Sequence, residues 1–401
     1  MGRTFGVIAL VAAVILAVTA ATLVDWRFWY RWHTLPTDAG EWPDSFYQPA
    51  VTIPGDAKAF FPSADPGQRT IDSAALEAAA DWAEAHNAAA LLVLHKGVVQ
   101  LERYWQGIGP DSHFTGRAMT RSMIPVLIAM AMEDGHIRSV DDPVGRYIPE
   151  WSEDPRGQIT LRQLLQNVSG LENPALEGDP DPRNKNNRLS LGSNMRRAAL
   201  GFELEHEPGE FFQLSNANAQ LLGVVLETAT GENYQDYLNR RLWAPLGAGP
   251  AIFYMDRPNG MPATYCCFRA APRDWLRFGA ALSRDGQTAT GQQLWPAGWV
   301  AEMTTPSAVY PNYGFQIWTG NPAGTMRPYI QGGSFGVTHG PPINTDNVFF
   351  LEGGGHRMLY VLPDHELVIL RLGYFHPGWQ TSTLPNLVLA GIQQHGVPTA
   401  P

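Results

Sequence analysis

Runs of apolar and polar residues predict helices and strands over most of the chain. Apolar residues recur at helical spacing over 76–83, and Asp72 stands where its side chain can cap that helix. Two apolar runs follow, at 90–95 and 98–104, and Lys96-Gly97 separates them. Two such runs around a short turn are typical of a β-hairpin.

A second helical pattern extends from about residue 118 to residue 133 and stops at Gly135. Pro125 falls inside it, where the missing backbone donor should bend the helix. Further helical patterns cover 160–166, 215–229, 232–242, 272–283 and 384–394, and strand patterns cover 313–318, 358–361 and 367–372. Strands and a helix, then a helical block, then strands and a helix predict an α/β domain with a helical insertion.

The N-terminal residues 5–24 are almost entirely apolar, and about 20 such residues suffice for a helix that spans a bilayer. Aromatic residues and two arginines follow within 25–32, and aromatic residues gather at the membrane–water interface. We therefore expect residues 1–32 to form a transmembrane anchor with an aromatic belt. A cleaved signal peptide, with Val18-Thr19-Ala20 as the cleavage site, is the alternative. Both predict that the rest is exported, with 33–69 as a linker or a wrap on the surface.

The composition is that of a globular protein and argues against nucleic-acid binding. Of the 401 residues, 28 are Lys or Arg and 38 are Asp or Glu, so the net charge is −10. Nucleic-acid binding needs clustered Lys and Arg, whereas these charges are scattered along the sequence. Cys266 and Cys267 are adjacent, and adjacent cysteines rarely pair because the ring that they close is strained. We therefore expect free thiols, and no disulfide framework, metal or other cofactor.

Short motifs follow one another in a characteristic order. They are AMTRS (118–122), EDGHI (133–137), DDPV (141–144), YIPEW (147–151), ITLRQLL (159–165), SGL (169–171), EPGE (207–210), SN (215–216), QLLG (220–223), RDW (273–275), RFG (277–279) and the strand LVILRLG (367–373). Together they resemble the serine β-lactamase and penicillin-binding-protein superfamily, which includes class C β-lactamases, DD-peptidases, esterases and 6-aminohexanoate-dimer hydrolases.

The resemblance implies a domain at 70–398, in which an antiparallel sheet is flanked by helices. Its α/β part would comprise about 70–117 and 251–398, and an inserted all-helical part about 118–250. The implied chemistry is acyl transfer through a serine ester. In the family, a Ser-x-x-Lys motif places the lysine amine one helical turn from the hydroxyl that it activates. A Tyr-x-Asn motif passes on the proton, and a Lys-Thr-Gly or His-x-Gly strand binds the substrate.

The sequence departs from the family at the reacting positions. Ala118 stands at the position of the nucleophile, and Arg121 stands at the position of the base. A methyl group cannot attack a carbonyl, and a guanidinium stays protonated in proteins. In the second motif Leu214 replaces the tyrosine, whereas Asn216 is retained.

No alternative register restores the first motif. The lysines are Lys58, Lys96 and Lys185, and none of them has Ser, Thr or Cys three residues before it. Ser122 and Thr120 lie beside the lost site, but Ser122 is about 100° further round the helix and is expected to be structural.

The third motif falls at about 353–357, without a lysine at the usual place. Gly354, Gly355 and His356 are therefore candidates for the pocket, beside Arg121 and Asn216. His356 could act as a general base with Glu352 as its partner, although a lone histidine is ordinarily structural. The glycine run is better explained as a bend of the strand than as a phosphate loop.

Two functional hypotheses remain open. The first is a pseudoenzyme of the cell envelope, whose cleft or surface binds a small molecule, an envelope ligand or a protein partner. Arg121 would give that cleft a fixed positive charge, which favours an anionic ligand. The second is a working amide or ester hydrolase with a rewired site. The expected location is the bacterial inner membrane, with one span and a periplasmic domain, or secretion if the N-terminus is cleaved.

Overall fold

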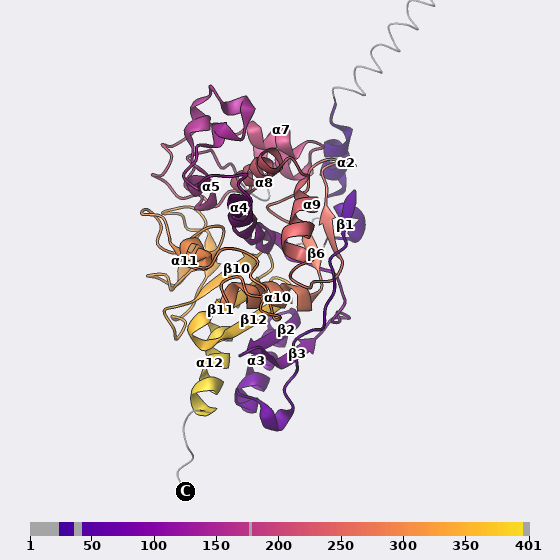
Figure 1. Cartoon of the computed structure of the whole chain (residues 1–401), viewed down its shortest axis with the longest axis vertical. Helices are drawn as coiled ribbons and strands as arrows, with labels where there is room; N and C mark the ends of the chain where they lie inside the picture. The colour runs from indigo at the N-terminus through magenta and orange to yellow at the C-terminus, as the bar shows by residue number, and fades with distance from the viewer. Residues whose placement is uncertain (1–23, 36–41, 176–178, 396–401) are drawn as a thin grey trace, which may run out of the picture.

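The computed structural model describes residues 24–35, 42–175 and 179–395, and its centre is a six-stranded antiparallel sheet (Figure 1). The order across the sheet is β3-β2-β12-β11-β10-β7. The strands are β2 (Ala88–His95), β3 (Val98–Tyr104), β7 (Trp318–Thr319), β10 (Phe349–Gly353), β11 (Arg357–Leu362) and β12 (Leu367–Gly373). β2 and β3 are the predicted hairpin, and it lies beside the last strand of the chain because β12 pairs with β2.

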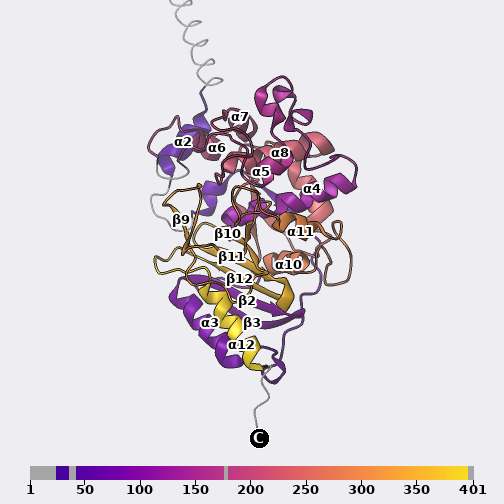
Figure 2. The ribbon, with the colours of Figure 1, turned by 90° about the vertical axis from the view of Figure 1, so that its left-hand side faces the viewer.

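Helices cover both faces of this sheet (Figure 2). α3 (Ser73–Ala85) and α12 (Thr383–His395) pack together on one face, and α10 (Pro272–Ser283) covers the other. Side chains alternate along β12, so that Ile369 belongs to the core under α3 and α12, and Val368 to the core under α10. A strand buried on both faces reads as a continuous apolar run, as β2 does.

A helical part lies at the end of the sheet that is remote from α12 (Figure 1). Its α-helices are α4 (Ile124–Glu133), α5 (Leu161–Leu165), α6 (Lys185–Leu191), α7 (Met195–Leu200), α8 (Asn216–Thr230) and α9 (Tyr234–Leu238). α8 is the central one, because every residue from Ala217 to Leu226 is buried. This mixed α/β arrangement of an antiparallel sheet and flanking helices is the one expected.

A second sheet joins the beginning of the described chain to its middle. Its order is β1-β5-β6-β4, with β1 (Ala50–Ile53), β4 (Phe114–Thr115), β5 (Ala251–Tyr254) and β6 (Phe268–Ala270). β1 comes from the segment 33–69, in which no strand was expected. It pairs with β5 over four residues and so ties this segment to the domain.

The first described helix, α2 (Trp26–Thr34), packs on the helical part. Phe28 from the expected aromatic belt is buried with Phe46 and Leu191, whereas Trp26 and Tyr30 are exposed. The predicted span at 5–24 lies, except for Val24, outside the described residues. Within the described ranges, no helix combines the length and hydropathy that a membrane span requires.

Three local predictions differ from the structure. The pattern at 118–133 is a 3₁₀ segment, η3 (Arg117–Met123), followed by α4. Pro125 therefore lies in the first turn of α4, where a helix has no use for its N–H, and does not bend a helix interior. The expected strand at 313–318 is reduced to its last residue in β7, and the helix at 232–242 ends in a π-helical turn, η7 (Asn239–Trp243).

The expectation of free thiols is wrong, because Cys266 and Cys267 form a disulfide. Successive side chains of an extended strand point to opposite sides. Cys267 instead has a φ of 74°, at the end of a turn in which the Cys266 N–H donates to the carbonyl of Ala263. This left-handed conformation removes the alternation and brings the two sulfur atoms together.

Candidate functional site

The family's first and second motifs meet in one small pocket of about 40 Å³. Ala118 and Arg121 enter it from η3, Leu214 from the segment before α8, and Gly353 and Gly354 from the end of β10. The other lining residues are Tyr313, Gln316, Trp318, Tyr329 and Glu352. The structure therefore brings together Ala118, Arg121 and Leu214, the three positions to which the sequence resemblance assigned nucleophile, base and proton carrier.

β6 holds η3 in place. The N–H of Gly116 donates to the carbonyl of Phe268, and the N–H of Phe268 donates to the hydroxyl of Thr120 at 3.1 Å. That hydroxyl in turn donates to the carbonyl of Arg117 at 2.7 Å. A Cβ atom at Gly116 would lie 2.4 Å from the ring of Trp275, so only glycine fits there.

Arg121 is buried with unsatisfied donors. Its side chain is 5% exposed, and Nη2 donates to Oδ1 of Asn216 at 2.6 Å. Nε and Nη1 are buried and have no hydrogen-bond partner among the described residues. A buried donor without a partner costs free energy, and a guanidinium keeps its charge. The pocket wall therefore contains a buried positive charge whose hydrogen-bonding capacity is not fully used.

The retained Asn216 is held by its neighbours. The N–H of Ser215 donates to the side chain of Asn167, and the N–H of Leu214 donates to the carbonyl of Tyr329 at 2.8 Å. Leu214 consequently adds an apolar wall to the pocket, where the family pattern has a tyrosine. Asn216 accepts the hydrogen bond from Arg121 at the first turn of α8.

Glu352 is a titratable group of the pocket, and the sequence indicated it only as a partner for His356. It lies on β10, where the hydroxyl of Tyr329 donates to Oε1 at 2.9 Å and Oε2 is buried without a partner among the described residues. Burial raises the pKa of Glu352 to about 7, although Arg327 and Arg121 oppose this shift. Glu352 therefore changes its charge near neutral pH.

Tyr329 reaches the pocket from a β-hairpin formed by β8 (Met326–Pro328) and β9 (Gly336–Thr338). This hairpin is bound to the segment before α8, since the N–H of Gln331 donates to the carbonyl of Phe212. Phe335 at its tip is 76% exposed and contacts the ring of Tyr329 edge to face. Tyr329 could not be predicted from the sequence, because this segment has neither periodicity nor a family motif.

Gly353 lies where β10 meets η3. A Cβ atom there would be 2.2 Å from the carbonyl oxygen of Gly116, whereas one at Gly354 would meet nothing within 4 Å. Packing therefore requires glycine at the first position of the run, because the backbones of β10 and of the segment that begins η3 approach closely there.

The structure does not bring Gly355 and His356 into the pocket. The ring of His356 stacks on Trp379, and its Nε2 donates to the carbonyl of His376 at 3.2 Å. Burial lowers the pKa of His356 to about 4, which keeps the ring neutral. Arg371 donates to the carbonyls of Gly355 and His356 and fixes the turn that ends β10. That turn carries both residues past the edge of the pocket.

The hydroxyl groups of Ser122 and Thr120, which lie beside the lost nucleophile in the sequence, are used in the fold. Ser122 is 1% exposed and donates to the carbonyl of Gln316 at 2.7 Å, and Thr120 binds η3 to β6. Among the described residues that line the pocket, none is Ser, Thr, Cys or Lys. The lining therefore offers a cation, a carboxyl group and aromatic surface.

Comparison with known proteins identifies the family of the chain. The family model described as beta-lactamase matches residues 74–373. Protein flp of Staphylococcus aureus (strain MRSA252) is 31% identical over 140 residues, which are 34% of this chain and 27% of that protein. The 6-aminohexanoate-dimer hydrolase of Paenarthrobacter ureafaciens is 26% identical over 223 residues, 53% of this chain and 56% of that protein. The chain thus spans between a quarter and just over half of these relatives.

Solved structures share the fold at low sequence identity. A proposed 6-aminohexanoate-dimer hydrolase from Bacillus anthracis has a TM-score of 0.66 and 18% identity, over 88% of this chain and 90% of that one. A penicillin-binding-protein homologue from Caulobacter crescentus has a TM-score of 0.59 and 14% identity, over 82% of this chain and 99% of that one.

Proposed function

The chain belongs to the β-lactamase family, and on that premise we propose that it is a member without acyl-transfer activity whose cleft binds an acidic group of a ligand. One observation carries the proposal: beside the methyl group of Ala118, the buried guanidinium of Arg121 has two donors without partners among the described residues. An oxygen atom of an anion would accept a hydrogen bond from this guanidinium, and such charge-assisted bonds are strong.

The size of the pocket limits what can enter. Its volume is about 40 Å³, and one water molecule needs roughly 10–15 Å³ of such space. A carboxylate group fits this volume, whereas a whole amide or ester substrate does not. A larger ligand would place its acidic group beside Arg121 and the remainder under the β8–β9 hairpin, which would have to move.

Glu352 makes the proposed binding depend on pH. Above its pKa of about 7 the carboxylate repels an anion held by Arg121, and below it the neutral carboxyl group does not. Anion binding should therefore strengthen as the pH falls from 8 to 6.

The proposal predicts that acetate binds and that its uncharged analogue acetamide does not. We expect acetate to raise the midpoint of thermal unfolding of the full chain in a saturable manner, and more so at pH 6 than at pH 8. Arg121→Ala should weaken acetate binding at least about tenfold, because it removes charge-assisted hydrogen bonds. Arg183→Ala is the matched control, since Arg183 is exposed and does not line the pocket. Equal responses of the two variants would refute an acidic ligand at Arg121.

The loss of acyl transfer has its own test. The full chain is incubated with a fluorescent fluorophosphonate and a fluorescent penicillin, and any adduct is located by mass spectrometry. We expect no adduct and no turnover of simple esters. An adduct on Ser122, on Thr120 or elsewhere in the cleft would show a rebuilt nucleophile and would contradict the proposal.

A second candidate is an esterase that uses water as the nucleophile, and the pKa of Glu352 near neutrality favours it. The β8–β9 hairpin would have to move for this candidate too, because the whole ester does not fit the pocket as it stands. Glu352 would accept a proton from water, and the water oxygen would bond to the carbonyl carbon of the ester. The C–O bond to the alcohol would then break, and Glu352 would return the proton to the departing alkoxide. Arg121 would stabilise the oxyanion. Ester turnover without a covalent adduct, abolished by Glu352→Gln, would select this candidate.

We place the domain on the outer side of the bacterial inner membrane. This placement rests on the hydropathy of residues 5–24. Protease digestion of intact and permeabilised spheroplasts tests it, because an exported domain is cut in both.

A further inference from the structure

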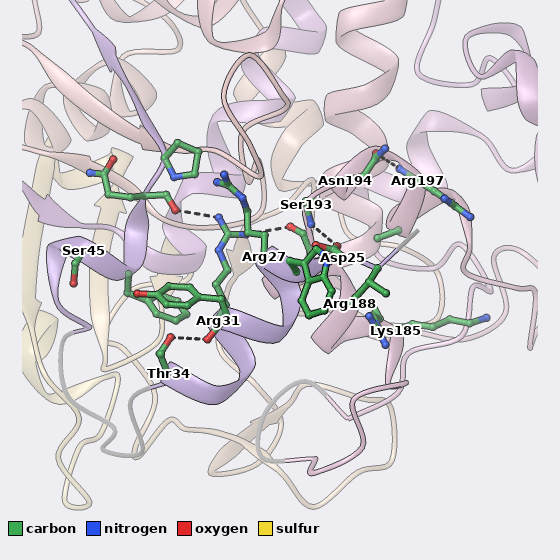
Figure 3. Close-up of a pocket in the computed structure, with 18 of the residues that line it drawn as sticks. Asp25, Arg27, Arg31, Thr34, Ser45, Lys185, Arg188, Ser193, Asn194 and Arg197 are labelled. Atoms are coloured by element: carbon green, nitrogen blue, oxygen red, sulfur yellow. Dashed lines mark hydrogen bonds between the residues drawn. The ribbon is translucent and has the colours of Figure 1, made fainter. Parts of the chain in front are cut away.

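A second, larger pocket lies beside α2, at the end of the molecule remote from α12 (Figures 1 and 3). It is open, has a volume of about 1,380 Å³ and shares no lining residue with the small pocket. Its walls are α2, the segment 43–49, and α6 with the segment up to residue 201. Inferences about it are therefore independent of the function proposed for the cleft, and the occupant proposed below rests on the proposed placement of the chain at the membrane.

The lining of this pocket is strongly basic. The chain as a whole has a net charge of −10. Five cationic side chains nevertheless line the pocket against one acidic side chain, Asp25, and they are Arg27, Arg31, Lys185, Arg188 and Arg197. They come from two segments more than 150 residues apart, so the cluster exists only in the fold.

Part of this charge holds the pocket together. Arg31 is 2% exposed, and its guanidinium donates to five backbone carbonyls from three segments. Asp25 accepts hydrogen bonds from the N–H groups of Phe28 and Ser193, and so joins the start of α2 to the segment before α7 (Figure 3). Lys185 is paired with Glu172. The walls of the pocket are thus built before any ligand arrives.

The remaining cations are available to a ligand. Arg27, Arg188 and Arg197 form no ion pair within the described part of the chain, although acidic residues outnumber basic ones. Arg188 lies over the ring of Phe28 at 3.8 Å, which orients its planar guanidinium. A guanidinium can donate two parallel hydrogen bonds to two oxygen atoms of one phosphate.

Two exposed aromatic side chains lie on α2. Trp26 and Tyr30 are 59% and 70% exposed and lie one helical turn apart, and both line the pocket. Trp and Tyr concentrate at the level of the lipid headgroups, with the ring toward the acyl chains and the polar atom toward water. Their combination with unpaired arginines suits a membrane surface better than a site for a soluble ligand.

We propose that this pocket binds the phosphate headgroup of an anionic phospholipid. Arg27, Arg188 and Arg197 would hold the phosphate, and Trp26 and Tyr30 would contact the glycerol and upper acyl region. The position of α2 supports this occupant, because the helix begins two residues after the apolar sequence 5–24 that is expected to span the bilayer. Anionic lipids attract juxtamembrane Lys and Arg. The domain would then be held against the membrane in one orientation.

The test uses the full chain in micelles of a neutral detergent, titrated with phosphatidylglycerol or phosphatidylcholine and followed by native mass spectrometry. We expect selective retention of phosphatidylglycerol. The double variant Arg27→Gln/Arg197→Gln should weaken it roughly 30-fold, since each juxtamembrane cation contributes to the attraction of an anionic lipid. Arg31 and Arg188 are left intact, because both take part in packing α2.

The matched control is Arg138→Gln/Arg183→Gln, which makes the same change in net charge at two exposed arginines outside the pocket. It should retain the lipid as the unaltered chain does. Equal retention of the two lipids, or equal loss in both double variants, would overturn the proposal. If glycerol phosphate or inorganic phosphate stabilises the chain through Arg27 and Arg197 while the lipids are not distinguished, the site binds a soluble phosphate, and the lipid assignment is wrong.

Discussion

At the scale of single residues, the buried carboxyl group of Glu352 makes stability depend on pH. Its pKa is raised from 4.5 to about 7, so the folded chain keeps a proton that the unfolded chain has lost between these values. The free energy of unfolding therefore falls as the pH rises through this range, and the full penalty is present above pH 7.

Glu352→Gln should remove this penalty. The amide oxygen can still accept the hydrogen bond from Tyr329, and no charge is buried. We expect the variant to be more stable by about 3 kcal/mol at pH 8 and nearly unchanged at pH 4 in urea unfolding. Glu153→Gln makes the same chemical change at an exposed position. A gain that is equal at both pH values would show that the charge of Glu352 is not the cause.

The sequence predicted the site residues that belong to regular motifs. Arg121 and Asn216 could be paired because their motifs have fixed places in the fold, and they are hydrogen-bonded in the structure. His356 could not be placed, since the preceding glycines leave the register of the turn undetermined and one step moves a side chain out of the pocket. Tyr329 was missed because a loop residue enters a site through tertiary contacts alone.

At the scale of elements, the contact between β10 and η3 depends on a missing side chain. Gly353→Ala would place a Cβ atom 2.2 Å from the carbonyl oxygen of Gly116, so the strand or η3 must shift. We expect a loss of about 1–3 kcal/mol in the free energy of unfolding. Gly354→Ala, the neighbouring substitution into open space, should cost less than about 1 kcal/mol. Equal losses would mean that β10 and η3 do not pack as described.

The docking of α2 depends on Arg31. Arg31→Met keeps much of the aliphatic chain but leaves five backbone carbonyls without this donor. We expect α2 to detach at a cost of about 2–4 kcal/mol. Hydrogen exchange of the amides at 26–34 should accelerate, while exchange in β2 stays slow. Arg27 lies on the same helix but outside this network, so Arg27→Met should change neither the hydrogen exchange of α2 nor that of β2. If the two variants exchange alike, Arg31 does not fix α2.

Elements with a strong local pattern were the predictable ones. The hairpin at 90–104 consists of two apolar runs around a short turn, and α10 has periodic apolar residues. Asp72 caps α3 by accepting hydrogen bonds from two N–H groups. β4 and β6 contain two and three residues, which is too short for any period to appear. η3 replaces the start of the predicted helix, and this change follows from contacts with β6 that the local sequence does not contain.

At the scale of the whole molecule, the order of strands, helical block and strands could be predicted from the sequence, but apart from the β2–β3 hairpin the pairing of the strands could not. The pairing of β2 with β12 joins the two ends of the domain, and it could be expected only from the resemblance to a known family. The same limit applies to the basic pocket, whose arginines are scattered in the sequence and gather when α2 meets α6 and α7. Charge counted along a chain therefore underestimates the local charge of a folded surface.

The central position of β12 has a consequence for biosynthesis. Its partner β2 leaves the ribosome roughly 270 residues earlier, which at 5–20 residues per second is a delay of about 15 to 55 seconds. During this interval β2, whose eight residues are all buried in the folded chain, has no neighbour on one side. The central sheet can form completely only after translation is nearly finished. If the chain is exported, its sheet would therefore still be unfolded while it crosses the translocon. Holding chaperones should accordingly bind the segment 88–95 of nascent chains that end before residue 367.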